Sequence, residues 1–298
     1  MQTRYATAFG LTWSSDLDLW QFLGMEKAPV ADIVVSVLSG GVADRVSVMQ
    51  HRCSTICRDG FRFSTKDEAV FDIYGNDRIT ITPLERWDGV LPLHFFGTTT
   101  AALLALRGLV PMHGTAVEMN GKAVLLCGRS GAGKSTLGVN LISMGGRLIS
   151  DDLTALRAEP GGRVQAVAGR PGIRLHPDAA KRLRATLPEE AVKPSAFGKI
   201  IAFPPRVAPA TSYPIAGIVR LGGTGDAFAA AQRFAWLCAQ SFRPRLMHLL
   251  PGHAARMAAL AGLVQSVPLL HLPGLQNYSD DGCRDGAETI RRWFDKVS

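Results

Sequence analysis

The sequence predicts an α/β protein in which a small strand-rich unit, residues 1–90, precedes a larger domain, residues 91–298. Three observations support this. Short apolar segments bounded by turn residues fill the first part of the chain. A glycine-rich segment at 128–135, GRSGAGKS, then stands between an apolar strand and a helix. Beyond it, segments with strand and helix patterns alternate, which is typical of an α/β domain.

The composition limits the class of protein. Of 298 residues, 47% are hydrophobic and 19% are charged, as in a globular protein. The net charge of +8 favours an anionic partner such as a nucleotide, a nucleic acid or a membrane surface. Five cysteines, with no signal-peptide pattern at the start, predict reduced thiols and a cytoplasmic protein. The apolar segment 98–111 is too short to span a membrane, so no membrane association is expected.

The expected elements of the first unit are strands joined by tight turns. Gly75-Asn76 separates two apolar segments and predicts a hairpin. The segment 93–109 is apolar at mixed spacing, and we expect a helix that leads into the larger domain. The strands are expected at 33–38, 62–64, 69–74 and 78–82.

The larger domain is expected to begin with a hairpin. Asn120-Gly121 predicts a type I′ turn between a strand at 115–119 and an apolar strand at 122–127 that needs burial on both faces. A helix at 135–144 ends at Gly145-Gly146, and a buried strand follows at 147–150. The next 60 residues are rich in proline and glycine, so we expect loops there. The remaining expected elements are a strand at 215–221 and helices at 179–186, 227–241, 254–264 and 287–296.

The segment 128–135 fits the phosphate-binding pattern G-x-x-x-x-G-K-[ST] in full. Its glycines let backbone N–H groups turn inward and form, with the start of the following helix, a positive nest for a phosphate. Lys134 adds a charge over the β- and γ-phosphates, and the Ser135 hydroxyl is a ligand for Mg²⁺. The alternative is a glycine-rich turn that binds nothing, but the entering strand and leaving helix favour ATP and Mg²⁺. The predicted nucleotide-binding residues are Gly128, Arg129, Ser130, Gly131, Ala132, Gly133, Lys134, Ser135 and Thr136.

Two adjacent acids, Asp151 and Asp152, follow the buried strand at 147–150. Ligands of open α/β sheets bind at the carboxyl ends of strands, so this pair should face the phosphates. One carboxylate can hold Mg²⁺, and the other can accept the proton of an incoming hydroxyl group. The two like charges should also raise the pKa of one acid, which suits a base. The alternative, that either acid only caps a turn, is less favoured beside a phosphate-binding loop.

A family resemblance rests on the order of these motifs. The order is His113-Gly114, strand, turn, strand, GRSGAGKS, helix and GGRLISDD. This order resembles the HPr kinase/phosphorylase family, whose catalytic domain is related to phosphoenolpyruvate carboxykinase. The resemblance covers 113–153 closely and the rest of the larger domain loosely. It implies a P-loop kinase domain of that type. The first 90 residues look more like the shortened partner unit of HPr-kinase-related proteins, including those encoded beside lasso-peptide genes.

The resemblance implies an ATP-dependent kinase that phosphorylates a serine hydroxyl on a peptide or protein. His113 matches the histidine near the transferred phosphate, and Lys134 matches the phosphate-binding lysine. Ser135 matches the metal-binding serine, Asp152 the proton acceptor, and Asp151 its neighbour, which we expect to assist at the metal. Because many members of the family form multimers, a homo-oligomer is also expected.

Two departures from the family pattern affect the expected activity. Thr136 stands where the family usually has an acid, and residues 169–177 hold no acid where the family has a glutamate-containing loop. We therefore expect kinase activity without phosphorylase activity. Arg174 and Lys199, together with Arg170, are candidate cations for the phosphoryl group in transit.

Several alternatives stay open. The acceptor is first a lasso-peptide precursor, then an HPr-type carrier protein, then a small hydroxylated metabolite. From other classes, the chain is a nucleotide-dependent regulatory module without transfer, or a carboxykinase-like enzyme whose additional metal ligands are not found. Arg243 and Arg245 either contact the acceptor or are ordinary solvated cations, which is favoured. Nucleic acid is not expected as a partner, because the short basic runs carry no interleaved aromatic residues.

Overall fold

The computed structural model describes residues 3–28, 30–183, 187, 192–194, 198–222, 229–273 and 280–298. Its contacts divide the chain into two compact units. The first consists of Met1–Leu109 and Arg243–Arg256, and the second of Val110–Phe242 and Met257–Ser298. The chain therefore completes its first unit only after it has passed through most of the second.

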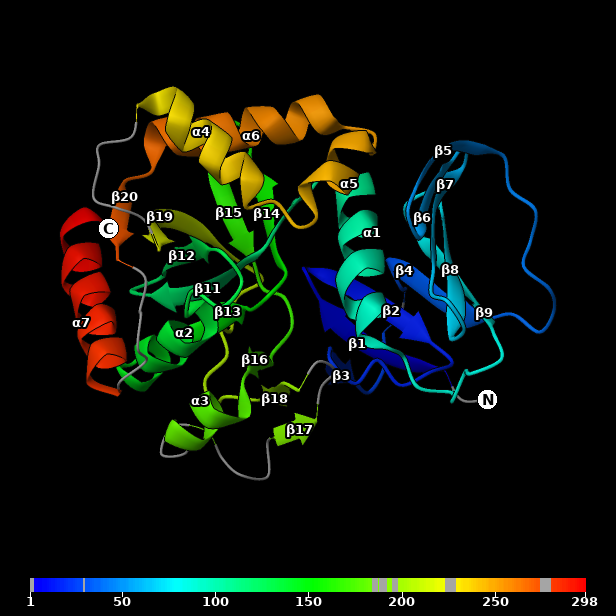
Figure 1. Cartoon of the computed structure of the whole chain (residues 1–298), viewed down its shortest axis with the longest axis horizontal. Coiled ribbons are helices and arrows are strands. Elements are labelled where there is room, and N and C mark those ends of the chain that lie inside the picture. The colour runs from blue at the N-terminus through cyan, green and yellow to red at the C-terminus, as the bar shows by residue number, and fades with distance from the viewer. Residues whose placement is uncertain are drawn as a thin grey trace. The chain divides into compact units, whose positions relative to one another are not determined.

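The first unit is built on a sheet of nine described strands in the order β3-β1-β2-β4-β9-β8-β7-β6-β5 (Figure 1). Its strands are β1 (Arg4–Ala8), β2 (Leu11–Ser15), β3 (Leu23–Met25), β4 (Ile33–Val37), β5 (Ser47–His51), β6 (Ser54–Cys57), β7 (Gly60–Ser64), β8 (Ala69–Tyr74) and β9 (Arg78–Pro83). The four expected strands are confirmed as β4, β7, β8 and β9. The expected hairpin joins β8 to β9, and Gly75 adopts a φ of 57° at its turn. The other five strands were not predicted, because polar residues interrupt their apolar pattern.

The segment expected as one helix is a π-helical turn, η1 (Phe95–Thr99), continued by α1 (Thr100–Leu106). Thr100 Oγ1 donates a hydrogen bond of 2.8 Å to the carbonyl oxygen of Phe95 at the junction. Both helical segments are almost wholly buried, and η1 packs against β7 and β8. This packing is why the compact units divide at Leu109, whereas the sequence pattern places the division after residue 90.

The second unit is built on a described eight-stranded sheet in the order β10-β14-β15-β19-β12-β11-β13, with β20 also paired to β19. A smaller sheet has the order β16-β18-β17. The large sheet consists of β10 (Val110–Met112), β11 (Gly114–Met119), β12 (Lys122–Gly128), β13 (Arg147–Ser150), β14 (Thr154–Ala158), β15 (Val164–Val167), β19 (Ser212–Leu221) and β20 (Leu269–Leu272). The small sheet consists of β16 (Ile173–Leu175), β17 (Val192–Pro194) and β18 (Ile200–Ala202).

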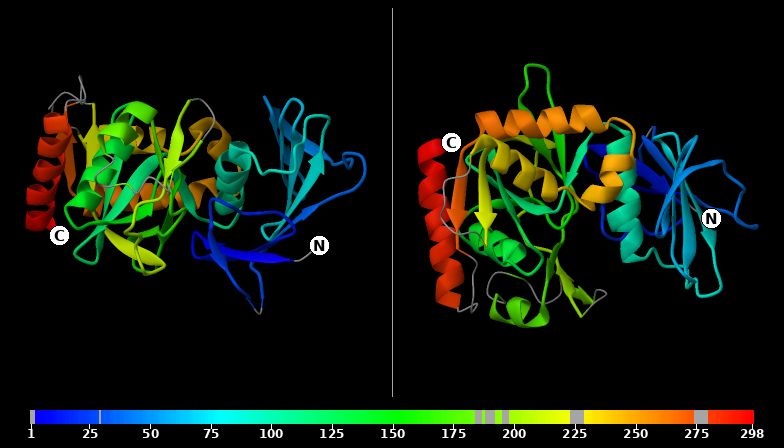
Figure 2. Two further views of the ribbon diagram at one scale, coloured as in Figure 1. Left: turned by 90° about the horizontal axis from the view of Figure 1, so that it is seen from below. Right: turned by 45° about the horizontal axis from the view of Figure 1, so that its top comes forward.

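Helices cover both faces of the large sheet, because alternate residues of its central strands point to two separate cores. Val124 and Leu126 of β12 join a core with α2 (Lys134–Ser143) and α7 (Asp280–Val297). Leu125 and Cys127 of β12 join another core with α4 (Ala230–Ala239) and α6 (His253–Ser266). Figures 1 and 2 show α7 lying along β19 and β20, away from α4 and α6. The predicted α/β fold and the two-sided burial of the 122–127 strand are confirmed.

Other expectations for the second unit are confirmed in part. The Asn120-Gly121 turn joins β11 to β12 with both φ angles positive, at 53° and 77°, as a type I′ turn requires. The helices expected at 135–144 and 254–264 shift by one or two residues, α7 starts seven residues earlier, and α3 (Pro177–Arg182) is shorter than the expected helix. Parts of the helices expected at 179–186 and 227–241 lie outside the described residues.

The expectation of loops over the 60 residues after Asp152 is wrong. That stretch contains strands β14 to β18, since its glycines stand at turns, such as Gly161-Gly162 between β14 and β15, rather than in long loops. Among the described residues, no helix is both long and apolar enough to cross a membrane.

Candidate active site

Three segments of the second unit meet where strands β11, β12 and β13 of the large sheet begin or end. β12 and β13 both run antiparallel to β11, so their carboxyl ends lie beside the start of β11. The glycine-rich loop follows β12, the two adjacent acids follow β13, and His113 precedes β11. A cavity of ≈ 660 Å³ opens here, lined by residues that include His113, Lys134, Ser135, Asp151, Asp152 and Arg174.

The loop after β12 is shaped by its glycines. Gly131 and Gly133 have φ angles of 82° and 94°, which L-residues rarely adopt, and α2 begins directly afterwards. Lys134 is 7% exposed, and its Nζ donates to the carbonyl oxygens of Gly128 and Arg129 at 2.9 and 3.1 Å. Burial lowers the pKa of this ammonium group, and the nearby Asp151 charge opposes that effect. The lysine is thus held against the loop that precedes it.

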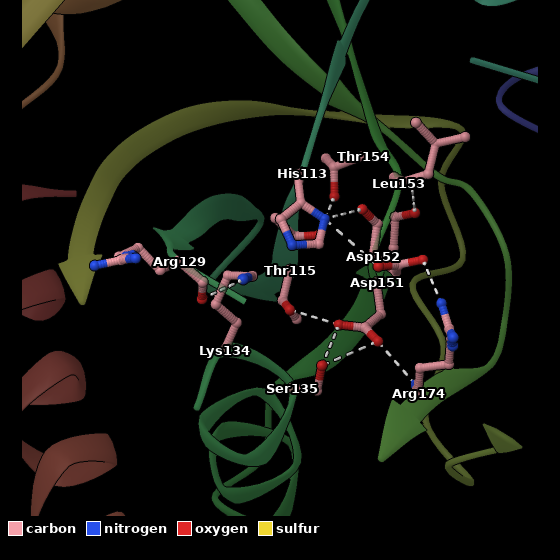
Figure 3. Close-up of polar contacts among 12 residues, drawn as sticks. His113, Thr115, Arg129, Lys134, Ser135, Asp151, Asp152, Leu153, Thr154 and Arg174 are labelled. Carbon is pink, nitrogen blue, oxygen red and sulfur yellow. Dashed lines mark hydrogen bonds and ion pairs between the residues drawn. The ribbon is translucent and has the colours of Figure 1, made fainter. Parts of the chain in front are cut away.

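Asp151 is the most enclosed acid of the cavity, with 2% of its surface exposed. Its carboxylate accepts hydrogen bonds from Ser135 Oγ at 2.9 Å, from Thr115 Oγ1 at 2.5 Å and from the Arg174 backbone N–H at 2.8 Å (Figure 3). Burial raises the pKa of the carboxyl group, against the effect of the hydrogen bonds from Thr115 and Arg174. Three different elements therefore fix the orientation of this one side chain.

Asp152 lies in different surroundings. Its backbone has a φ of 67°, which is uncommon for a residue with a side chain and is typical of constrained functional positions. Its Oδ2 lies 3.2 Å from Arg174 Nη1 and 3.6 Å from Arg170 Nη2. Burial alone would raise the pKa of Asp152, but the charges of Arg170 and Arg174 lower it overall. The raised pKa expected of the pair thus falls on Asp151, where burial outweighs the hydrogen bonds, and not on Asp152, where the charges of the two arginines outweigh burial.

His113 contacts Asp152 on one side and the segment that follows α4 on the other. Its Nδ1 lies 3.2 Å from the Asp152 carbonyl oxygen and 3.5 Å from Asp152 Oδ1. Its backbone N–H donates to the Gln240 carbonyl oxygen at 2.7 Å, and its ring packs edge-on against Phe242. Burial lowers the pKa of His113, and the Lys134 charge lowers it further. The imidazole is therefore neutral near pH 7.

The structure brings most of the other sequence-predicted residues to this cavity, but its lining does not include Gly128, Arg129, Ala132 or Arg170. Ser130, Gly131, Gly133, Thr136 and Lys199 line it. Arg129 contributes its carbonyl oxygen, but its side chain is exposed and points away from the acids (Figure 3). The sequence reasoning missed Thr115. The strand alternation of 115–119 contained the signal, since Thr115 faces α2 on the same side of β11 as Val117.

The oxygen atoms around Ser135 suit a magnesium ion. Magnesium in nucleotide sites is held by one or two protein oxygens together with phosphate oxygens and waters. Ser135 Oγ and the Asp151 carboxylate supply this kind of donor and already lie within 3.2 Å of each other. By contrast, no group of three or more His, Cys, Asp or Glu side chains that could hold a metal ion occurs in the part of the chain that the structure describes.

Comparisons with known proteins match the segment that builds this site. A family model described as the HPr Serine kinase C-terminal domain matches residues 105–170. HPr kinase/phosphorylase from Listeria welshimeri is 41% identical over 54 residues, which are 18% of this chain and 17% of that protein. HPr kinase/phosphorylase from Leptospira biflexa is 42% identical over 67 residues, 22% of this chain and 20% of that protein. The chain thus aligns with about a fifth or less of the length of these relatives.

Among solved structures, the Hpr(Ser) kinase/phosphatase from Coxiella burnetii matches this chain, and the match covers 61% of this chain and 98% of that one. Its sequence identity is 13% and its TM-score 0.31, a level that does not establish a shared fold. The residues matched by the family model, 105–170, include His113, the glycine-rich loop and both acids. The segment that carries the candidate active site, residues 105–170, is therefore similar to the C-terminal domain of HPr kinases.

Proposed function

We propose that the chain is an ATP-dependent kinase that transfers the γ-phosphoryl group to a serine or similar hydroxyl on a peptide or protein. The observation that carries this proposal is the convergence of a basic loop, a hydroxyl and two acids on one cavity. Lys134, Ser135, Asp151 and Asp152 all line it. Phosphoryl transfer needs little else from a protein than such positioning and charge neutralisation.

The nucleotide binds through the loop at 128–133 and the start of α2, in the manner of P-loop kinases of the HPr kinase type. The backbone N–H groups there and the helix dipole favour the phosphates. Lys134 leaves its two loop carbonyl partners and contacts the β- and γ-phosphates. Because those carbonyls hold the ammonium group in place, little reorganisation is needed.

Ser135 and Asp151 hold Mg²⁺ in this proposal, with the other ligands supplied by the phosphates and water. Mg²⁺ there neutralises charge between the β- and γ-phosphates. Thr115 and the Arg174 backbone N–H keep the Asp151 carboxylate directed at Ser135. Thr115 is in this respect a positioning residue.

Asp152 receives the proton in the transfer step. The acceptor hydroxyl oxygen forms a bond to the γ-phosphorus while the bond from that phosphorus to the bridging oxygen of ADP breaks. The hydroxyl proton moves to the Asp152 carboxylate, and ADP departs. Arg174, which lies 3.2 Å from Asp152, and Lys199 are placed to stabilise the charge on the phosphoryl group.

The names of the relatives indicate only the class of molecule that accepts the phosphoryl group. They are called HPr kinase/phosphorylases, so an HPr-type carrier protein is one candidate acceptor. A peptide precursor, such as that of a lasso peptide, is the other. We propose the forward reaction only, because the stretch 169–177 contributes two arginines and no acid beside Asp152.

A single-turnover experiment tests the proposal. The purified chain is mixed with γ-labelled ATP, Mg²⁺ and either HPr protein or a serine-containing precursor peptide, and label on the acceptor is measured. Asp152→Asn should lower transfer by about 10²–10⁴-fold, the usual contribution of a general base, while nucleotide binding persists. Asp178→Asn is the matched control, since Asp178 lines the same cavity from α3.

Two results would contradict the proposal. If the Asp152→Asn variant labels the acceptor as fast as the parent chain, Asp152 is not the proton acceptor. If ATP binds but no label reaches either acceptor, the chain is a nucleotide-dependent regulatory module instead of a kinase.

A further inference from the structure

The first unit contains a second cavity, which has no part in the proposed reaction. Its volume is ≈ 680 Å³, about the same as that of the candidate active site. Its walls are the turn between β5 and β6, the turn between β7 and β8, and the start of α5 (Pro244–Leu249). The lining residues are 51–54, 63–68, 94 and 243–246. We call it the basic cavity, for the reason that follows.

Cationic side chains outnumber acidic ones in the basic cavity by four to two. The cations are Arg52, Lys66, Arg243 and Arg245, and all four are exposed. In the part of the chain that the structure describes, none of these four side chains forms an ion pair or a hydrogen bond. Their charges are therefore available to an incoming anion.

The two acids reduce this positive charge only in part. Asp67 already pairs with Arg86, at 3.2 Å between carboxylate and guanidinium. Glu68 stays on the wall among the cations. The cavity thus combines a positive surplus with one local acidic position, a pattern that suits a ligand of mixed charge better than a uniformly anionic one.

The floor of the basic cavity is apolar. Phe63 is 5% exposed and packs against the His94 ring at 5.5 Å, and Leu246 is 3% exposed. Burial lowers the pKa of His94, so this ring adds no charge near pH 7. A ligand for such a cavity presents both an apolar surface and negative charges, as an acidic peptide segment does.

We infer that the basic cavity binds an acidic segment of the acceptor polypeptide. This inference rests on the proposed function in so far as the acceptor is a polypeptide. Three features support a peptide: the volume is of the size that encloses part of a chain, the floor is apolar, and the unpaired charge is cationic. A phosphate backbone fits less well, because Glu68 would repel it. Arg243 and Arg245 then have a binding role, which their sequence pattern alone did not favour.

A binding experiment that needs no chemistry tests the inference. The probe is a fluorescein-labelled acidic peptide of glutamates interspersed with leucines and one lysine, and its anisotropy is followed as the full chain is added. Arg243→Glu with Arg245→Glu should weaken binding at least tenfold, since two attractive charges become repulsive. The matched control is Arg291→Glu with Arg292→Glu, which makes the same charge change at exposed positions of α7.

A second variant keeps the test independent of how the first one folds. Arg52→Glu with Lys66→Glu reverses two charges on the opposite walls, at the strand-pair turns, and should weaken binding to a similar degree. Circular dichroism verifies the fold of each variant. Repeating the titration in the Asp152→Asn chain separates this inference from the proposed function, because that variant should bind the probe as tightly as the parent.

Three outcomes would overturn the inference. One is that the parent and both cavity variants bind the probe equally tightly. Another is that the α7 control loses as much affinity for the probe as the cavity variants do. The third is tighter binding of a six-nucleotide oligo(dT), or equally tight binding of pyrophosphate, at the same sites, which would identify a nucleic acid or a small anion as the ligand. A labelled hexalysine peptide should not bind to the basic cavity.

Discussion

At the scale of single residues, the site depends on two adjacent acids that the protein treats differently. Asp151 accepts three hydrogen bonds from protein donors and has a raised pKa, whereas Asp152 faces two arginines and has a lowered one. Asp152 has a left-handed backbone, and its side chain lies near His113, Arg170 and Arg174 instead of the three donors that hold Asp151. A pair of identical residues can thereby serve a metal ion and a proton separately.

The sequence could predict the acids but not this division. Their place in the sequence, after a buried strand that follows the glycine-rich loop and its helix, predicts where they lie. Burial raises the pKa of Asp151, whereas Arg170 and Arg174 lower the pKa of Asp152. These arginines reach the site only through the pairing of β16 and the path of the chain before it. Thr115 was missed for a similar reason: strand alternation places it on one face of β11, but its hydrogen bond to Asp151 becomes known only from the pairing of β11 with β13.

From the lowered pKa of His113, we predict how the stability of the fold depends on pH. Because the folded chain holds this imidazole neutral, the unfolded state binds more protons below a pH of about 6.5, and stability is lost as the pH falls. Between pH 7 and pH 5, His113→Gln should reduce this loss of stability. Urea unfolding followed by circular dichroism at several pH values measures the slope. An unchanged slope in His113→Gln would refute the prediction.

At the scale of elements, the site depends on how closely α2 packs on β11. A Cβ atom at Gly138 would lie 2.8 Å from Thr115 Cγ2, a distance that real contacts do not tolerate. The glycine therefore lets the helix approach the strand that carries Thr115. The hairpin and helix of this region were predictable because Asn120-Gly121 and the loop glycines mark their ends. The strands after Asp152 were not, because they are short and their pairing partners lie far away in the sequence.

A double-mutant cycle tests the contact between α2 and β11. In the parent chain, Gly138→Ala should destabilise the fold by about 1–3 kcal/mol through overpacking. In a Thr115→Ser background the obstructing methyl group is gone while the hydroxyl is kept, so Gly138→Ala should be neutral or stabilising by up to about 1 kcal/mol, the helix preference of alanine. Urea unfolding of the four chains gives both values. Equal effects in the two backgrounds would show that this contact does not limit the packing.

At the scale of the whole molecule, the chain returns to its first unit late. Arg256 secures this return, with 2% of its surface exposed and hydrogen bonds to the carbonyl oxygens of Ala105, Met247, Leu250 and Pro251. Burial lowers the pKa of its guanidinium group, which has no acidic partner among these contacts. The sequence pattern could not predict the returning segment, since one buried arginine among exposed ones carries no signal.

Replacing Arg256 should loosen the first unit. Arg256→Met leaves four carbonyl oxygens without their donor and should destabilise that unit by about 3 kcal/mol or more. Arg256→Lys keeps the charge but not the planar arrangement of donors, so its effect should be intermediate. Hydrogen exchange of the β8–β9 hairpin measures the opening of this unit. Arg107→Met removes one exposed bond to the Asn76 carbonyl and serves as the control; equal effects of the two methionine variants would contradict the role of Arg256.

The late return also bears on how the protein is made. A ribosome that has just translated Leu109 must add the whole stretch to Arg256 before the first unit has all its parts, which takes roughly 7–30 s at about 5–20 residues per second. During that interval, the nascent β-strands lack the segment that completes their unit. Biogenesis of this protein is therefore exposed to premature pairing between neighbouring nascent chains, and holding chaperones should raise its yield.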